Sequence, residues 1–218
     1  MKTADAPDTT LLLARAAGGD VDAWGVLLAR HHERLQSVIS FRLDPRLRGR
    51  LDAADVMQDA FIAATARRAE FFGQTSQSLF LWLRWMVGNT LLELHRHHLG
   101  AQMRDAKRER TSRLGPDGAG DVTTRAALVA QLTGGVTGPV TAAGRAELKA
   151  RLTEALDRMD TIDREVLALR HYEQLTSSET AQVLGIQERA AAKRYLRALE
   201  RLREMLAEMP GGLTGLRP

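Results

Sequence analysis

The stretch Leu175–Arg203 constrains the fold of this chain most strongly, because it predicts two short helices joined by a tight turn. Thr176 and Glu179 have the spacing of a capping box, in which a hydroxyl caps a helix start and a glutamate reaches back to it. Gly185 follows where the chain must turn sharply, and glycine readily adopts the left-handed conformation that ends a helix. The pattern predicts a helix-turn-helix, whose second helix is shaped to enter a DNA major groove.

The second helix of this pair is strongly basic, with its cationic side chains at Arg189, Lys193, Arg194, Arg197, Arg201 and Arg203. Apolar residues recur on its other side at close to helical spacing. Two interpretations stay open on this evidence. The helix either presents an ordinary solvated basic face or reads DNA with it.

The amino-acid composition excludes some classes of protein for this chain and favours others. The absence of cysteine excludes a disulfide framework and any cysteine-based zinc site. Alanine, leucine and arginine dominate and aromatic residues are scarce, which favours an all-α protein. The net charge of +4 is unevenly spread, and a localised basic face favours nucleic-acid binding. The most apolar run, Leu79–Val87, contains Arg84 and is far shorter than the ~20 residues of a membrane span. With no visible signal peptide, we expect a cytoplasmic protein without membrane insertion.

Periodicity predicts helices over Leu11–Leu43, Asp52–Glu70, Leu79–His98, Leu148–Met159 and Arg164–Tyr172. Asp20 is expected to serve as a helix N-cap within the first of these segments, and Pro45 is expected to end that segment. His31, on the apolar face of that helix, is expected to be a packed core histidine. Residues 111–144 are rich in glycine, which predicts a flexible linker with at most a transient helix over Thr124–Leu132.

Two polar clusters allow more than one interpretation. Asp52, Asp55 and Asp59 share one stripe of a helix, and they are either solvated acids, a docking surface for a basic partner helix, or metal ligands. His95 and His98 are close enough in a helix to share a metal, but no cysteine or convincing carboxylate accompanies them. Polar residues facing phosphates are the preferred interpretation, and no metal or other cofactor is expected.

The order of these segments resembles the extracytoplasmic-function sigma factors, group 4 of the sigma-70 family. DREVLALRHYEQLTSSETAQVLGI and RYLRALERLR resemble region 4 of that family, and GDVDAW, DAADVMQDAFIAA and FLWLRWMVGNTLLELHRHH resemble region 2. The resemblance implies a region 2-like bundle of three or four helices over residues 10–110, a linker over 111–145, and a region 4-like helix-turn-helix domain over 146–207. It implies that the chain is a monomeric sigma factor and not an enzyme. Such a factor directs core RNA polymerase to specific promoters and assists promoter melting.

The resemblance also implies roles for individual residues. The beta-prime clamp helices of the polymerase would contact Asp52, Asp55, Val56, Gln58, Asp59 and Phe61. The melted −10 element would contact Phe71, Phe72, Trp82, Trp85, Asn89, Arg96, His97, Arg104 and Lys107, although Trp82 also fits a core position. The −35 duplex would contact Glu188, Arg189, Lys193, Arg194 and Arg197. Further partners implied are the polymerase beta flap and an anti-sigma factor.

The chain departs from the family pattern at several places. Gln187 stands where a serine or threonine cap is usual, and Ala191 and Ala192 stand where valine and lysine are commoner. The loop before Leu79 and the linker are both long. Two other functions remain as alternatives: a dimeric helix-turn-helix regulator that binds operators without polymerase, and a metal-dependent nuclease built on Asp52, Asp55, Asp59 and the histidines.

Overall fold

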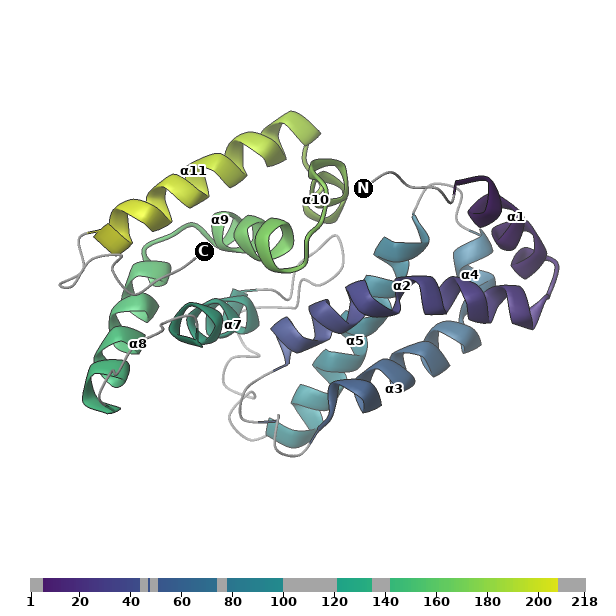
Figure 1. Cartoon of the computed structure of the whole chain (residues 1–218), viewed down its shortest axis with the longest axis horizontal. Coiled ribbons are helices and arrows are strands. Elements are labelled where there is room, and N and C mark those ends of the chain that lie inside the picture. The colour runs from purple at the N-terminus through teal and green to yellow at the C-terminus, as the bar shows by residue number, and fades with distance from the viewer. Residues whose placement is uncertain are drawn as a thin grey trace.

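The fold is a set of helices in two units, shown in a computed structural model that describes residues 6–43, 47, 51–73, 78–99, 121–134 and 142–207 (Figure 1). The N-terminal unit contains α1 (Ala6–Ala17), α2 (Val21–Arg42), α3 (Ala53–Ala66), α4 (Arg68–Gly73) and α5 (Leu79–Leu99). The C-terminal unit contains α7 (Asp121–Gly134), α8 (Ala142–Asp157), α9 (Thr161–Leu167), η1 (Ala168–Tyr172), α10 (Ser177–Leu184) and α11 (Glu188–Ala207). The described ranges contain no strand, so the all-α class is confirmed.

The N-terminal unit packs α2, α3 and α5 around one apolar core, with α1 lying against α2. Asp20 caps α2 as expected, because its Oδ1 accepts a hydrogen bond from the Ala23 backbone N–H at 2.9 Å. α2 ends at Arg42, and Leu43 is extended at the position two residues before Pro45. The start and the end of α2 are therefore determined by the local sequence.

The predicted helix Asp52–Glu70 ends earlier than expected, and a second, short helix follows it. α3 ends at Ala66, and residues Arg68–Gly73 form the short helix α4. α4 places Phe71 in the core, where its ring lies 5.4 Å from the ring of Trp82. Burial of this aromatic side chain stabilises the short helix α4 against the core.

The segment expected to be a flexible linker contains a packed helix. α7 buries Thr124, Ala127, Leu128 and Val129, and the three apolar residues join the core of the C-terminal unit. The sequence indicated only a transient helix here, because helix propensity alone does not report packing against α8 and α9. The structure therefore corrects the expectation of flexibility over 121–134.

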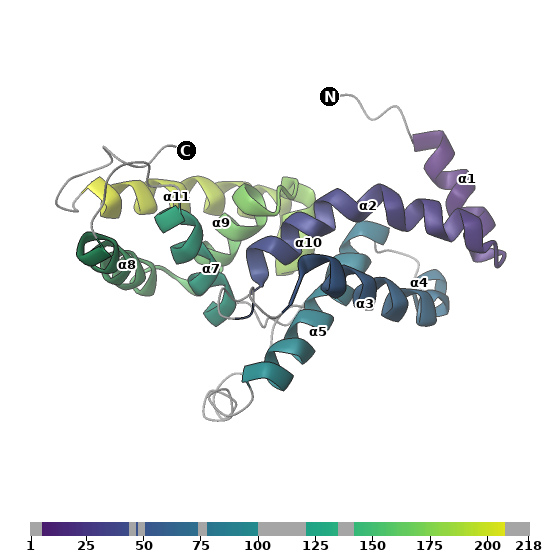
Figure 2. The same cartoon turned by 60° about the horizontal axis from the view of Figure 1, so that its bottom comes forward.

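The two units lie side by side, with α2 meeting the C-terminal unit near η1 and α10 (Figures 1 and 2). The contact region includes η1, a short π-helical segment that follows α9 directly and forms the C-terminal part of the predicted helix Arg164–Tyr172. After η1 the chain passes through Gln174, whose φ of 55° is in the left-handed region. This turn brings Leu175 into contact with the N-terminal core.

Candidate functional site

The helix-turn-helix has the geometry expected from its sequence. Thr176 Oγ1 accepts from the Glu179 backbone N–H at 3.1 Å, and a Glu179 carboxylate oxygen accepts from the Thr176 backbone N–H at 2.8 Å. The capping box is therefore confirmed. Gly185 ends α10 with φ of 64°, which redirects the chain into α11. Ala191 and Ala198 of α11 are fully buried, so one face of this helix is held against the unit.

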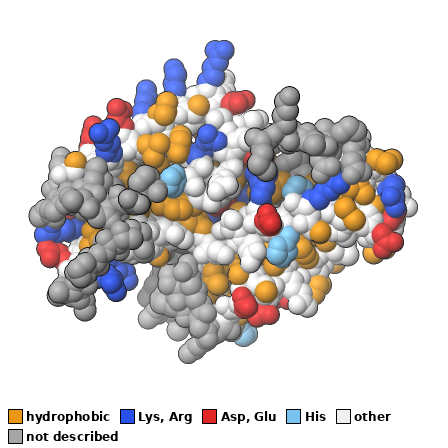
Figure 3. Space-filling view, viewed as in Figure 1, with side chains coloured by type: hydrophobic (Ala, Val, Ile, Leu, Met, Phe, Trp, Pro, Cys, Tyr) orange, Lys and Arg blue, Asp and Glu red, His pale blue; other side chains and the backbone are white. Residues whose placement is uncertain are grey.

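The opposite face of α11 is open to solvent. Four of the five residues expected to contact the −35 duplex are exposed there: Glu188, Arg189, Lys193 and Arg197. Figure 3 shows lysine and arginine side chains projecting along this edge of the molecule. The outer face of α11 therefore offers cations to a ligand without prior rearrangement.

Arg194, the fifth of these residues, is held within the unit. Its Nη1 donates to Asp163 of α9 at 3.2 Å, and Arg201 donates to the other oxygen of the same carboxylate at 3.3 Å. Asp163 is buried, so this carboxylate fixes α11 against α9. A hollow of about 630 Å³ lies beside this cluster and includes Lys193 and Arg197 in its lining.

The acidic stripe of α3 is also at the surface. Asp52 caps α3, and the side chains of Asp52, Asp55, Gln58 and Asp59 are all exposed. Val56, which the resemblance assigned to the same surface, is instead fully buried in the core. Its position on the inner face of α3 removes it from direct contact with any partner in this arrangement.

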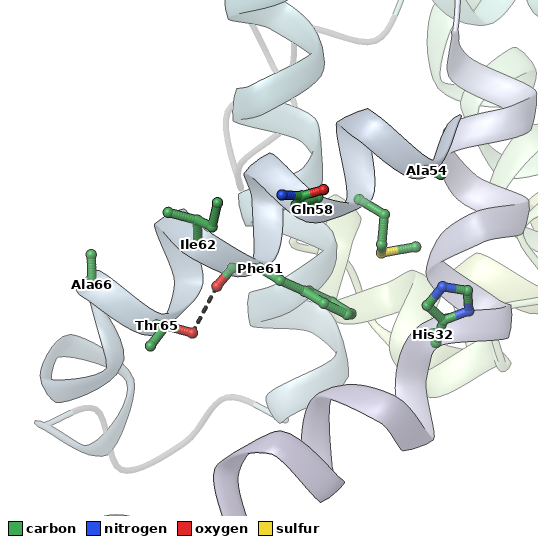
Figure 4. A pocket seen from close by; sticks show the side chains of 8 residues that line it. His32, Ala54, Gln58, Phe61, Ile62, Thr65 and Ala66 are labelled. Atoms are coloured by element: carbon green, nitrogen blue, oxygen red, sulfur yellow. Dashed lines mark hydrogen bonds between the residues drawn. The ribbon is translucent and has the colours of Figure 1, made fainter. Parts of the chain in front are cut away.

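An apolar groove of about 710 Å³ runs beside this stripe, between α2 and α3. Its lining includes Met57, Phe61 and Ile62 of α3 and His32 of α2 (Figure 4). Ile62 is 61% exposed, and the rings of His32 and Phe61 lie 6.4 Å apart in an edge-to-face arrangement. Acidic side chains beside an exposed apolar groove make a suitable surface for an amphipathic, basic helix.

The aromatic residues expected to contact melted DNA divide into core and surface positions. Trp82 is 2% exposed, and its ring lies 6.3 Å from Trp24. Phe71 is buried beside it, so the structure corrects the expectation of DNA contact for these two residues and agrees with the alternative core interpretation of Trp82. Phe72 and Trp85 are half-buried, and the Arg67 guanidinium lies 4.7 Å from the Trp85 ring centroid.

The polar residues of the same expected surface are only partly described. Asn89 is half-buried on α5, and His97 is exposed near its C-terminal end. The side chain of Arg96 lies outside the described part of the structure, as do Arg104 and Lys107 entirely. His31, expected in the core, is partly buried, and this burial lowers its pKa, with the nearby charge of Arg34 adding to the effect.

Sequence reasoning missed a cluster of buried charges between the two units. Arg42 of α2 and Arg84 of α5 both donate to Glu173, through their Nε atoms at 2.6 Å. Arg42 also donates to Glu165 at 2.6 Å and to Thr124 Oγ1 at 2.8 Å. One available signal was the position of Arg84 inside the apolar run Leu79–Val87, since a buried arginine requires a partner.

The electrostatics of this cluster keep its groups charged. Burial alone would raise the pKa of Glu173, but the charges of Arg42 and Arg84 and their hydrogen bonds outweigh it and lower this pKa to about 2. Burial would lower the pKa of Arg42, whereas Glu165 and Glu173 raise it above its usual value. The four side chains therefore form a neutral set of two cations and two anions.

Within the described ranges, no three histidine, aspartate or glutamate side chains come together as a metal site would require. None of the helices described there combines the length and the apolar character needed to cross a membrane.

Comparison with known proteins agrees with the helix-turn-helix geometry. The family model "Sigma-70, region 4" matches residues 149–202, which include α9, α10 and most of α11. The chain is 32% identical over 197 residues to the RNA polymerase sigma factor NccH of Alcaligenes xylosoxydans xylosoxydans, covering 89% of this chain and 92% of that protein. It is also 32% identical over 202 residues to the RNA polymerase sigma factor CnrH of Cupriavidus metallidurans, covering 90% and 93%.

The chain therefore belongs to the extracytoplasmic-function sigma factors of the sigma-70 family. Such proteins are regulators of transcription, so the hypotheses of a nuclease and of a polymerase-independent regulator are not supported. Two solved structures are also similar. One is CnrH in complex with the cytosolic domain of CnrY (27% identity, TM-score 0.48, 91% and 97% coverage). The other is the sigma factor RpoE with the anti-sigma factor NepR from Bartonella quintana (21% identity, TM-score 0.41, 87% and 99% coverage).

Proposed function

We propose that this sigma factor reads the −35 duplex with the outer face of α11. The observation that carries the proposal is the joint exposure of Arg189, Lys193 and Arg197 on a helix fixed by the capping box and Gly185. Arginine and lysine contact both base edges and phosphates in the major groove. Arg194 would act from the edge of this face, since Asp163 holds one of its donors.

Core polymerase would bind the N-terminal unit at α3. The exposed carboxylates of Asp52, Asp55 and Asp59 and the groove containing Phe61 and Ile62 support this assignment. Charge complementarity would guide the encounter with a basic helical partner, and the apolar groove would supply buried area. Gln58 lies between these features and lines the groove.

The −10 element would be held open beside α5. Of the residues expected there, Phe72, Trp85 and Asn89 are half-buried and His97 is exposed, so each keeps some surface in contact with solvent. Extruding a base costs a few kcal/mol, and stacking on an aromatic ring returns about 1–3 kcal/mol per base. In this mechanism the chain is not itself an enzyme, because it supplies binding and specificity while the polymerase carries out synthesis.

Run-off transcription with purified core polymerase on a randomised promoter library tests this function. We expect transcripts from a defined start that depend on this chain. Reversing one charge of the stripe, Asp55→Lys, should weaken association with core polymerase, because it places a cation opposite a basic partner. Glu154→Lys on α8 is the matched control, since Glu154 is also exposed and lies on the other unit. Transcripts without a defined start, or equal association of the two variants, would contradict the proposal.

A further inference from the structure

The first half of α5 reaches the surface along one narrow stripe. Over residues 79–89, Trp85 and Asn89 are half-buried, as is Gly88 between them, and the other residues are buried. Trp85 and Asn89 are four positions apart, so they lie one turn from each other on the same side of the helix. An indole ring and an amide are therefore the side-chain groups that this part of α5 offers to a ligand.

Arg67 covers the ring of Trp85, although it lies outside the set of residues that the family resemblance implied. It is the C-cap residue of α3, and its backbone N–H donates to the Ala63 carbonyl at 3.1 Å. From this position its side chain reaches α5, where the guanidinium carbon lies 4.7 Å from the centroid of the Trp85 ring. The ring quadrupole attracts a cation in this place. The end of α3 thus sets a flat cation over the indole.

Hydrogen bonds hold the edges of this guanidinium. Its Nε donates to Glu70 Oε1 at 2.9 Å and its Nη2 donates to Glu70 Oε2 at 2.6 Å, which is the paired geometry of arginine and carboxylate. Its Nη1 donates to Met86 Sδ at 3.9 Å. The Arg67 side chain is nevertheless 40% exposed. With its edges bonded and one face over the ring, the guanidinium turns its other face to solvent.

This arrangement favours stacking over attraction of charge. Arg67 and Glu70 together carry no net charge, so the pair attracts a phosphate only weakly. A planar guanidinium accepts an unpaired base on its face, as an aromatic ring does. The Asn89 amide supplies both donors and an acceptor for the edge of a base. An unpaired nucleobase is the ligand that suits both groups.

We propose that Arg67 and Trp85 form a two-layer platform for one unpaired base of the melted −10 strand, with the guanidinium of Arg67 as the layer that touches the base. Glu70 is a positioning residue, because it acts on the base only through Arg67. The identity of the strand rests on the proposed function, whereas the platform itself rests on the contacts of Arg67.

Two other roles for Arg67 predict different results. If Arg67 contacted a phosphate, lysine would replace it, and Arg67→Ala would lower the salt dependence of DNA binding by roughly one unit. If Arg67 were a lid in the place of the base, Arg67→Ala would strengthen binding. A stacking layer instead requires the plane of the guanidinium, which lysine lacks although it keeps the charge.

Binding of holoenzyme to a fork-junction promoter with an unpaired −10 strand separates these roles. The promoter is one selected by run-off transcription, and each −10 nucleotide is replaced in turn by an abasic nucleotide. For the native chain we expect one position at which loss of the base weakens binding about fivefold or more, the low end of what stacking contributes per base. Fluorescence anisotropy over a series of salt concentrations measures the dissociation constants.

Arg67→Lys and Arg67→Ala should each bind the intact strand about fivefold or more less tightly, with the native salt slope. At the sensitive position, removal of the base should weaken their binding by less than about twofold, because the stacking layer is already missing. Arg68→Lys is the matched control, since it makes the same exchange at the next residue, and should stay within about twofold of the native chain throughout.

Glu70→Ala tests the positioning role by the sign of its effect. Removing an anion near a strand of phosphates would strengthen binding by charge alone. Loss of the acceptors that hold Arg67 should instead weaken binding of the intact strand and leave binding at the sensitive abasic position unchanged. Equal or tighter binding of the intact strand by Glu70→Ala would overturn this role.

The platform and the proposed function fail in different ways. If the native chain and both Arg67 variants lose equally at the sensitive abasic position, the platform is overturned and capture of a −10 base stands. Rescue by lysine, a lower salt slope, or tighter binding of Arg67→Ala would also overturn the platform. If no abasic nucleotide weakens binding of the native holoenzyme, capture of a −10 base fails, and the platform fails with it.

Discussion

Arg42 and Arg84 carry the same charge as Arg189 and Arg197, but the two pairs lie in opposite environments. The first pair is 2% exposed and bound to Glu173, whereas the second pair is exposed on the outer face of α11. A buried guanidinium must be paired with carboxylates inside the protein, while an exposed one remains available to phosphates. The comparison teaches that arginine content alone does not locate a nucleic-acid surface in this chain.

The largest expected effect is a difference in the free energy of unfolding between a variant that unpairs the buried arginines and a variant that removes an exposed arginine. Glu173→Ala leaves two buried arginines without their shared carboxylate, and removing one partner of a buried pair typically costs about 3–5 kcal/mol. Urea unfolding followed by tryptophan fluorescence should show this loss in the free energy of unfolding. Arg197→Ala should change it by less than about 0.5 kcal/mol, as exposed substitutions usually do. Similar losses for the two variants would remove the distinction.

Acidification should weaken the contribution of the buried carboxylate of Glu173. In the folded protein the charges of Arg42 and Arg84 lower the pKa of Glu173 to about 2 from its usual value of 4.5, so its contribution is fully present above pH 4.5 and is lost as the pH falls toward 2. The difference corresponds to about 3 kcal/mol. Urea midpoints measured between pH 5 and pH 2 should therefore fall more steeply in the native chain than in Glu173→Gln, in which this position does not titrate. Parallel curves would show that the carboxylate of Glu173, placed between Arg42, Arg84 and Glu165, is not the responsible group.

The helix-turn-helix that presents the exposed cations of α11 is stabilised by the helix cap at Thr176, which can be removed by a single substitution. Thr176→Ala deletes the hydroxyl that caps α10, and loss of such a cap costs about 1 kcal/mol. Thr153→Ala on α8 is the control, since its hydroxyl donates only to a backbone carbonyl within its own helix. A thermal unfolding experiment should rank the native chain and the control together, above Thr176→Ala. Equal midpoints for the two variants would indicate that the cap contributes nothing measurable.

The smallest expected change in stability accompanies a change in DNA binding. Lys193→Ala should leave the free energy of unfolding nearly unchanged but reduce the salt dependence of DNA binding by about one unit, if Lys193 neutralises one phosphate. Fluorescence anisotropy over a series of salt concentrations measures this slope. Lys149→Ala on α8 should keep the native slope. An unchanged slope for Lys193→Ala would exclude a phosphate contact for this residue.

Features that depend on neighbours within one or two turns were predictable. The capping box at Thr176, the cap at Asp20 and the left-handed turn at Gly185 each connect residues no more than five positions apart, and all three are present. The resemblance to sigma factors extended these local signals to a family, since it rests on the order of several motifs. The resemblance assigned some residues to partner-binding surfaces although their side chains are buried. Val56, Phe71 and Trp82 share helices with exposed residues, and only the packing shows which face of each helix is buried.

The sequence by itself therefore determined most of the helices, the caps at Asp20 and Thr176, the helix-turn-helix and the family. Only the tertiary structure decided that α7 packs against the C-terminal unit, that Trp82 belongs to a core, and that two arginines meet one glutamate. Glu173 lies 131 residues from Arg42 and 89 residues from Arg84 along the chain. No local pattern encodes pairs at such separation, because they form only when burial of apolar side chains from both units brings α2, α5 and η1 together.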